Sequence, residues 1–259
     1  MPGPAGHAAR RAALAVLLGL GLARCATAPP APPVALTIPP GQGAALAERW
    51  AAEWEAFEGL RAAVDLRAKN RQGSERVAAV LLVAPTALRV EVATPFGLPA
   101  VVATAGADDI TIFHVLERRV ERARPTPEAV GRWLGVPLAP QTLIRLLVGN
   151  VPPPPDPQAI TTDSAPTPHL TWTENGVRHR VWVTADGRPA RLLLAGAGGD
   201  WLLADFEWSV AGGLVGLRVE APERGTELQV RYLSAERVQN PPEAFHLVLP
   251  PDVPVQRLD

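Results

Sequence analysis

Alternating apolar and polar residues, interrupted by short turn sequences, constrain the fold of this chain more than any other feature. Residues 64–69 read Val-Asp-Leu-Arg-Ala-Lys, and such a period of two is typical of a strand with one buried face. Asn175-Gly176 and Asp186-Gly187 are two-residue hairpin signals flanked by further strand-like runs. Connections this short leave no room for crossover helices, so the pattern predicts an antiparallel meander. We expect about eleven strands, at residues 60–69, 77–83, 88–93, 100–104, 110–115, 170–173, 177–184, 188–195, 201–209, 214–221 and 226–233.

A segment with helical periodicity precedes the first strand. In residues 44–59, Leu46, Trp50, Trp54 and Phe57 recur at steps of four, four and three, which places them on one face of a helix. This apolar face packs onto the sheet, or it also lines a cavity for an apolar ligand. The two interpretations are compatible, and the sequence leaves both open.

Two more helices are expected in the middle of the chain. Thr126-Pro127 combines a capping hydroxyl with proline at the first helical position, and Gly135 ends that helix. A further helix is expected over residues 140–148, before the proline-rich connection 152–157. A sheet of this many strands usually curls, which hides its edges and encloses a cavity.

The N-terminus has the layout of an export signal. Residues 1–11 are basic, and residues 12–23 form an apolar run that is too short to span a bilayer, which needs about 20 apolar residues. Cys25, the only cysteine, follows in Leu22-Ala23-Arg24-Cys25, which resembles a bacterial lipobox except that Arg24 replaces the expected small residue. A single cysteine cannot form an internal disulfide, and at this junction it is placed to carry a lipid.

These features predict three segments. Residues 1–25 are a lipoprotein-type signal peptide ending at the lipidation cysteine, 26–43 are a Pro/Ala-rich tether, and 44–259 form a single domain. Cleavage near Ala26 or Ala28 without lipidation, and an uncleaved anchor, remain alternatives.

Charge and chemistry exclude several functions. The formal net charge is −1 with both signs interspersed, so no basic stripe favours nucleic acid. No G-x-S-x-G elbow or Walker A pattern is present. His114, His169, His179 and His246 lack metal-ligand spacing, although His169 and His179 lie on neighbouring segments and could approach each other. We therefore expect no enzyme activity, no cofactor and no metal site.

The loop between two of the expected strands is unusually apolar. Residues 93–100 read Ala-Thr-Pro-Phe-Gly-Leu-Pro-Ala and carry Phe96 and Leu98 near their centre. Hairpin tips normally face water and hold polar turn residues. This tip therefore folds back over the core or meets another apolar phase.

Three stretches resemble the LolA/LolB superfamily of lipoprotein carriers and receptors, and LolB-like outer-membrane receptors in particular. Pro95-Phe96-Gly97, between the strands of residues 88–102, resembles the Pro-Leu-Gly type loop of LolB-like proteins. Residues 126–152, with Trp-Leu-Gly-Val-Pro-Leu at 133–138, resemble the two-helix insertion of the superfamily. The late hairpins ending in Phe-His-Leu-Val-Leu-Pro at 245–250 resemble its C-terminal part.

The resemblance implies a mainly β fold, a curved, incomplete antiparallel β-barrel with helices over its open side. It implies a lipid-anchored receptor in the outer membrane, facing the periplasm, that accepts acylated lipoproteins from a LolA-like periplasmic carrier and helps insert them into the membrane. Phe96, with Leu98 second, would place cargo into the bilayer. We expect a monomer. The candidate cavity-lining residues are Trp50, Trp54, Val64, Leu66, Leu88, Val90, Val92, Trp133 and Leu147.

A different class of protein remains as the alternative. A lipid-anchored envelope sensor or scaffold could use the same curved sheet to hold a lipid or a protein partner. Uptake of acylated cargo separates the two, because a scaffold should not accept it.

Overall fold

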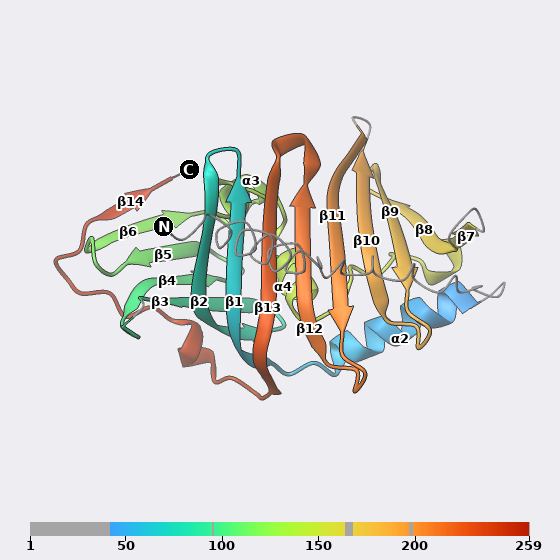
Figure 1. Ribbon diagram of the computed structural model, residues 1–259, viewed down its shortest axis with the longest axis horizontal. Coiled ribbons are helices and arrows are strands. Elements are labelled where there is room, and N and C mark those ends of the chain that lie inside the picture. The colour runs from blue at the N-terminus through green and yellow to red at the C-terminus, as the bar shows by residue number, and fades with distance from the viewer. Residues whose placement is uncertain (1–41, 95, 164–167, 197–198, 259) are drawn as a thin grey trace, which may run out of the picture. The chain divides into compact units, whose positions relative to one another are not determined.

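The computed structural model describes residues 42–94, 96–163, 168–196 and 199–258. Within these ranges the strands form one curved sheet, and the helices cover one of its faces (Figure 1). The predicted fold class, mainly β with a helical cover, is confirmed. The predicted signal peptide, Cys25 and most of the tether lie outside the described residues.

The sheet has fourteen strands in the described part of the chain, in the order β14-β6-β5-β4-β3-β2-β1-β13-β12-β11-β10-β9-β8-β7. All pairs are antiparallel except β14 with β6. The strands are β1 (Leu60–Asn70), β2 (Gly73–Ala84), β3 (Ala87–Ala93), β4 (Pro99–Ala105), β5 (Ile110–His114), β6 (Arg119–Ala123), β7 (Thr161–Asp163), β8 (His169–Glu174), β9 (Val177–Val183), β10 (Pro189–Gly196), β11 (Gly199–Trp208), β12 (Leu214–Ala221), β13 (Thr226–Arg237) and β14 (Val255–Arg257).

The eleven strands expected from the sequence are all present, and three more were missed. Both β7 and β14 have three residues, too few to show a period. In β6, the alternation of Arg119, Val120 and Glu121 puts charges on the face that turns inward, so it does not read as a half-buried strand. Each of the three was missed because tertiary pairing, rather than local pattern, makes it a strand.

The helices are α2 (Gln42–Glu55), α3 (Pro127–Leu134) and α4 (Pro140–Leu147), with 3-10 turns η1 (Pro157–Ala159), η2 (Pro222–Arg224) and η3 (Pro242–Phe245). The stripe on α2 packs onto the sheet: Trp50 is buried, and its Nε1–H donates to the Gly187 carbonyl at 3.1 Å. The Thr126 hydroxyl caps α3 by accepting from the Ala129 N–H at 3.3 Å. None of the helices in the described ranges is long and apolar enough to cross a membrane.

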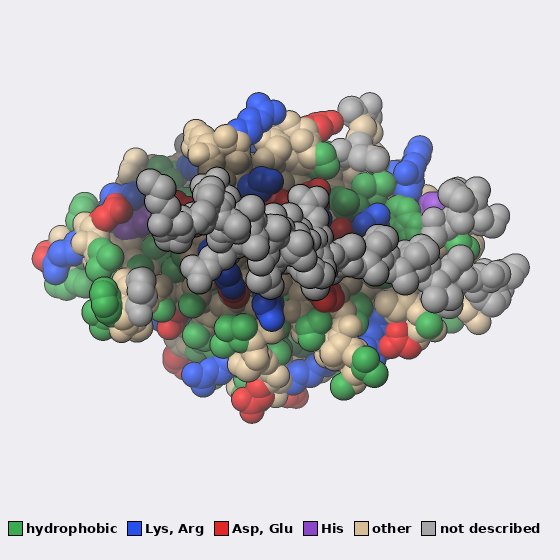
Figure 2. All heavy atoms as spheres, viewed as in Figure 1, with side chains coloured by type: hydrophobic (Ala, Val, Ile, Leu, Met, Phe, Trp, Pro, Cys, Tyr) green, Lys and Arg blue, Asp and Glu red, His purple; other side chains and the backbone are tan. Residues whose placement is uncertain are grey.

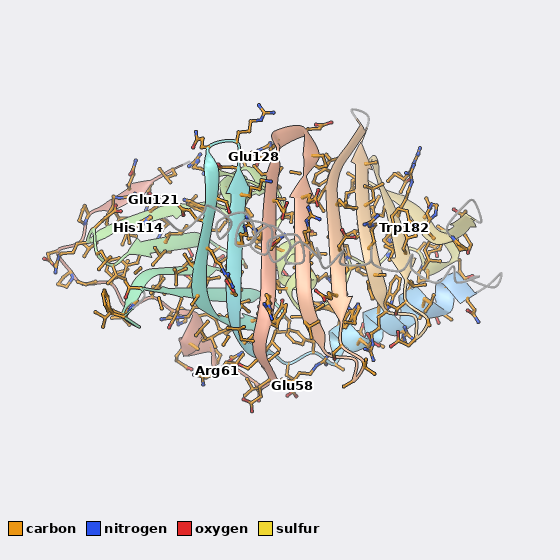
Figure 3. All side chains as sticks on the ribbon, in the orientation of Figure 1. Glu58, Arg61, His114, Glu121, Glu128 and Trp182 are labelled. Atoms are coloured by element: carbon orange, nitrogen blue, oxygen red, sulfur yellow. The ribbon has the colours of Figure 1, made fainter. Side chains whose placement is uncertain are left out.

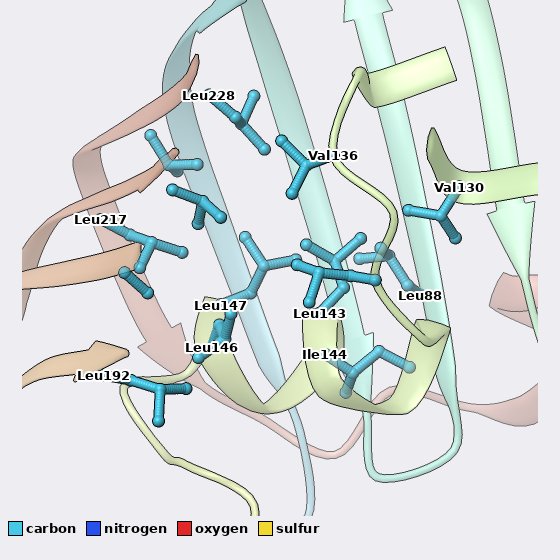
Figure 4. Close-up of a cluster of buried hydrophobic side chains, with 14 of the residues drawn as sticks. Leu88, Val130, Val136, Leu143, Ile144, Leu146, Leu147, Leu192, Leu217 and Leu228 are labelled. Atoms are coloured by element: carbon cyan, nitrogen blue, oxygen red, sulfur yellow. The ribbon is translucent and has the colours of Figure 1, made fainter. Parts of the chain in front are cut away.

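Helix α4 lies at the centre of the core. Its side chains Leu143, Ile144, Leu146 and Leu147 are buried in the cluster formed by the inner face of the sheet (Figure 4). Arg145 points away and stacks over the ring of Trp54 on α2, 4.1 Å from the ring centroid. Burial of its guanidinium lowers the pKa of Arg145.

The C-terminal strap, residues 238–254, runs along the other face of the first half of the sheet. Arg89 of β3 donates to the Ala244 carbonyl at 3.1 Å, and Arg118 pairs with Asp252 at 2.6 Å. The Val120 N–H donates to the Pro254 carbonyl at 3.1 Å, directly before β14 pairs with β6. The strap thereby covers Val120, which is fully buried.

Candidate functional site

An apolar cavity of about 80 Å³ lies between helices α3 and α4 and the inner face of β3, β4 and β5. The sheet register builds its floor, because Val90 pairs with Ala103 and Ala103 pairs with Ile112. Residues in directly opposed positions lie on the same face of a sheet, so these three apolar side chains together form the floor of the cavity. The lining residues are Leu88, Val90, Ala103, Thr104, Ala105, Ile110, Ile112, Val130, Trp133, Leu134, Pro140 and Leu143.

A second cavity, of about 190 Å³, lies at the opposite end of α4. Leu147 and Val148 form one wall, and Phe57, Trp208 and Tyr232 contribute aromatic walls. Leu143 of α4 lines the first cavity and Leu147 of α4 lines the second. The first cavity thus lies at one end of α4 and the second, whose lining includes Arg237, lies at the other end.

Both cavities are small in this conformation. Pockets for drug-sized ligands have volumes of about 300–1,000 Å³, and a cavity of about 150 Å³ holds a benzene molecule. A long acyl chain therefore needs more room than either cavity offers. To hold such a chain, the first cavity would have to enlarge by movement of α3 or α4 away from the sheet.

The nine residues predicted to line a cavity all lie in the hydrophobic core or pack against it. Leu88, Val90 and Trp133 line the first cavity, and Leu147 lines the second. The other five do not line either cavity; they are Trp50 and Val64, which are buried, and Trp54, Leu66 and Val92, which are partly buried.

A polar cluster borders the first cavity, and sequence reasoning missed it. Trp133 of α3 donates its Nε1–H to Glu121 Oε2 of β6 at 2.8 Å. Arg119 pairs with Glu121, and His114 Nε2 lies 3.5 Å from Glu121 Oε1. Figure 3 shows His114 and Glu121 side by side on neighbouring strands.

Glu121 is ionised within this cluster. Burial opposes its negative charge, but the Trp133 hydrogen bond and the Arg119 guanidinium outweigh burial and hold the pKa of Glu121 below its ordinary value. This half-buried carboxylate accepts the indole N–H of Trp133 and thereby ties α3 to the sheet beside the cavity. Only the non-local contact with Trp133 distinguishes Glu121 from an ordinary charged surface residue.

The apolar loop does not fold back over the core. Phe96 is 91% exposed and Leu98 is 63% exposed. The Gly97 N–H donates to the Thr94 carbonyl at 2.9 Å, and Gly97 has φ +79°, a conformation that favours glycine. Of the predicted loop motif, Pro95 lies outside the described residues. The tip holds two large apolar side chains in water.

The histidines of β8 and β9 do not meet. His169 stacks on Trp182 with ring centroids 4.9 Å apart, and His179 stacks on Trp172 at 5.0 Å. Burial lowers the pKa of His179 to about 4, so its imidazole is neutral at physiological pH. No cluster of three metal-ligating side chains occurs in the part of the chain that the structure describes.

Comparison with known proteins identifies the fold. No family model and no curated protein match this sequence. Among solved structures, it is similar to a domain named for outer membrane lipoprotein sorting from Vibrio parahaemolyticus, with a TM-score of 0.54 and 14% identity over 79% of this chain and 96% of that one. A DUF1329 family protein from Desulfovibrio piger matches with a TM-score of 0.56 and 11% identity over 81% and 97%.

A LolA superfamily protein from Nitrosomonas europaea is also similar, with a TM-score of 0.51 and 13% identity over 79% of this chain and 97% of that one. The chain thus has a LolA-like fold, a curved sheet covered by helices. At these identities the likeness defines the architecture, and it does not single out the LolB-like receptors within the superfamily.

Proposed function

We propose that this protein is a lipid-anchored receptor that accepts acylated lipoproteins in its apolar core and helps insert them into the outer membrane. The observation that carries the proposal is the apolar cavity between the sheet and α3 and α4, in a fold shared with a lipoprotein-sorting domain. The transfer needs no covalent step, so no catalytic residue is assigned.

Cargo binding would begin with movement of the helical cover. Helix α3 is tied to the sheet by the hydrogen bond between Trp133 and Glu121, and α4 contributes Leu143 to the first cavity. Displacing either helix would enlarge this apolar cavity. Each buried methylene contributes about 0.8 kcal/mol, so an acyl chain gains enough from partial burial to hold the cover open.

Delivery would use the exposed loop. Phe96 and Leu98 are placed in water on a protruding hairpin, where an apolar membrane interface would receive them. Lipidated Cys25, beyond the described residues, would hold the domain at the membrane. A LolA-like periplasmic carrier would supply the cargo.

The test is a transfer assay with the full chain. A carrier loaded with triacylated lipoprotein is mixed with the protein and then with liposomes, and the location of the lipoprotein is followed. Wild type should take up the cargo and release it to liposomes, whereas Phe96→Glu should bind cargo without delivering it. Val210→Glu is the matched control, because Val210 is also an exposed residue on a hairpin turn.

The result separates receptor from scaffold. If wild type takes up no lipoprotein, the receptor proposal fails. A function as a lipid-anchored sensor or scaffold then becomes the better-supported hypothesis. If Val210→Glu fails to deliver as Phe96→Glu does, the loop has no particular role.

A further inference from the structure

A second exposed apolar side chain lies beside the Phe96 loop. The turn between β5 and β6 carries Leu116, which is 71% exposed. The β3–β4 and β5–β6 turns lie at the same end of the sheet, because two antiparallel strands separate them. Figure 2 shows hydrophobic, basic and acidic side chains at the left end of this face, where Figure 1 places these turns.

The strand register puts the two tips next to each other. Val101 pairs with His114, and the Val115 N–H donates to the Ala100 carbonyl at 2.9 Å. Continuing this register places Leu116 opposite Pro99, and neighbouring strands are about 4.8 Å apart. Leu116 therefore lies beside the base of the loop that carries Phe96 and Leu98, and we call these three exposed residues the tip surface.

Several backbone groups of the two turns are already hydrogen-bonded within the protein. The Thr94 N–H donates to the Leu98 carbonyl at 2.7 Å, and the Leu98 N–H donates to the Thr94 hydroxyl at 3.2 Å. On the second turn, the Arg118 N–H donates to the Val115 carbonyl at 3.3 Å. Peptide groups that are already paired lose little when water is removed, whereas unpaired groups are costly.

The charges behind the tips are also paired. Arg118 bonds Asp252 of the strap at 2.6 Å, and Arg119 bonds Glu117 at 3.0 Å. Protruding apolar side chains above compensated charges suit the boundary of a bilayer, where tips are buried and ion pairs stay at headgroup level. A protein partner would favour a flatter patch with shape complementarity.

The tip surface is continuous with the cavity. On the inner face of β3 and β4, the pair Val90–Ala103 lines the cavity, and the next pair towards the tips on that face is Val92–Val101. Both valines are partly buried and pack against the core. One step of two residues covers about 7 Å along a strand. An apolar strip thus leads from the cavity to the tips.

We infer that the tip surface is a two-pronged docking site for a lipid bilayer, with Leu116 as the second prong beside Phe96 and Leu98. Docking by two adjacent turns fixes the tilt of the sheet, so that the Val92–Val101 strip ends at the membrane. This inference deepens the proposed function and rests on it only for the cargo that the strip would carry.

The experiment places an environment-sensitive NBD dye at single cysteines in the full chain, with Cys25→Ser to remove the native thiol. The labelled positions are Phe96→Cys, Leu116→Cys and, as the control at the opposite end of the strands, Val210→Cys. Vesicles of phosphatidylethanolamine and phosphatidylglycerol are the probe. The N-terminal segment is common to all three proteins, so differences among positions report the tip surface.

We expect the dye to shift to the blue at positions 96 and 116 but not at 210. In unlabelled protein, Leu116→Glu should weaken partitioning into vesicles about tenfold, as Phe96→Glu should, and Val210→Glu should leave it unchanged. A dye at 116 that stays aqueous while 96 inserts would overturn the second prong. A shift at 116 that needs the carrier protein and not the vesicles would overturn the bilayer as partner.

The two proposals fail in different ways. Vesicle docking with no uptake of lipoprotein from a loaded carrier would support the tip surface and refute the receptor function. Lipoprotein uptake with no dye shift at 96 and 116 would refute the tip surface and leave cargo binding intact.

Discussion

Trp133 of α3 donates its indole N–H to Glu121 of β6 across 2.8 Å, and this bond closes the rim of the apolar cavity. The acceptor is itself held by Arg119. One side-chain pair thus joins the helical cover to a strand near the edge of the sheet, beside the apolar cavity.

Trp133→Phe should loosen this cover. Phenylalanine keeps an aromatic ring but has no donor, and a hydrogen bond to a charged group contributes about 1.5–3 kcal/mol. We expect urea denaturation to show a loss of this order, and a fluorescent fatty acid to enter several-fold faster in stopped-flow measurements. Glu121→Gln, which keeps an acceptor, should show a smaller effect. Equal rates in all three proteins would mean that the cover opens elsewhere.

Ala103→Ile should fill the first cavity. Ala103 lies on the cavity floor, where the three added carbons would occupy much of a volume of about 80 Å³. We expect acyl-probe affinity to fall about tenfold or more, with the unfolding free energy changed by less than about 1.5 kcal/mol. The control is Ala78→Ile, because Ala78 of β2 is exposed and its side chain lies on the face of the sheet opposite the cavity. Unchanged affinity in Ala103→Ile would place the ligand outside this cavity.

Stability should fall as the pH is lowered from about 6.5 to about 4. His179 is buried and its pKa is lowered from 6.5 to about 4, so the unfolded chain binds a proton in this window that the native protein does not. The contribution is present above pH 6.5 and is lost as the pH falls, by up to about 3 kcal/mol. Chemical denaturation at several pH values measures it.

Substitutions test whether His179, rather than another ionisable group, causes this pH dependence of stability. His179→Phe keeps the stack on Trp172 and should flatten the pH profile between these values. His246→Phe, at an exposed position of the strap, should leave the profile as in wild type. A profile that keeps its slope in His179→Phe would show that another group titrates.

Gly149→Ala should destabilise the protein strongly. Gly149 has φ +76°, and a Cβ there would lie 2.3 Å from Cη2 of Trp208. The strained backbone and the clash with a packed indole together predict a loss of about 2–4 kcal/mol in denaturant unfolding. Gly73→Ala, where no atom lies within 4 Å of an added Cβ, should be nearly neutral. Equal effects at both positions would contradict the packing of Trp208 onto this turn.

The sequence predicts what depends on local pattern. Alternation, strand-like runs and turn sequences together located the strands from β1 to β5 and from β8 to β13, and the Thr126-Pro127 cap located α3. The cavity is different, because it depends on which strands face α3 and α4. Trp54 and Leu66 pack against the same core but away from either cavity, and no periodicity distinguishes them from Val90.

The pairing of Glu121 with Trp133 could not be predicted for a related reason. Neither residue shows a local signal for the other, and their contact requires the helical insertion to return over β6. The strap and β14 pose the same problem. Their residues pair with strands made far earlier in the chain, so they show no local signal.

The central pair of the sheet joins β1 to β13, with Leu60 opposite Arg237, so the first and the last long strands meet in the middle. Until β13 has been synthesised, β1 has only one neighbour and the two halves of the sheet cannot merge. Contacts between distant parts of a chain form slowly. The two halves of the sheet can therefore join only late in synthesis, after residues 226–237 have been made.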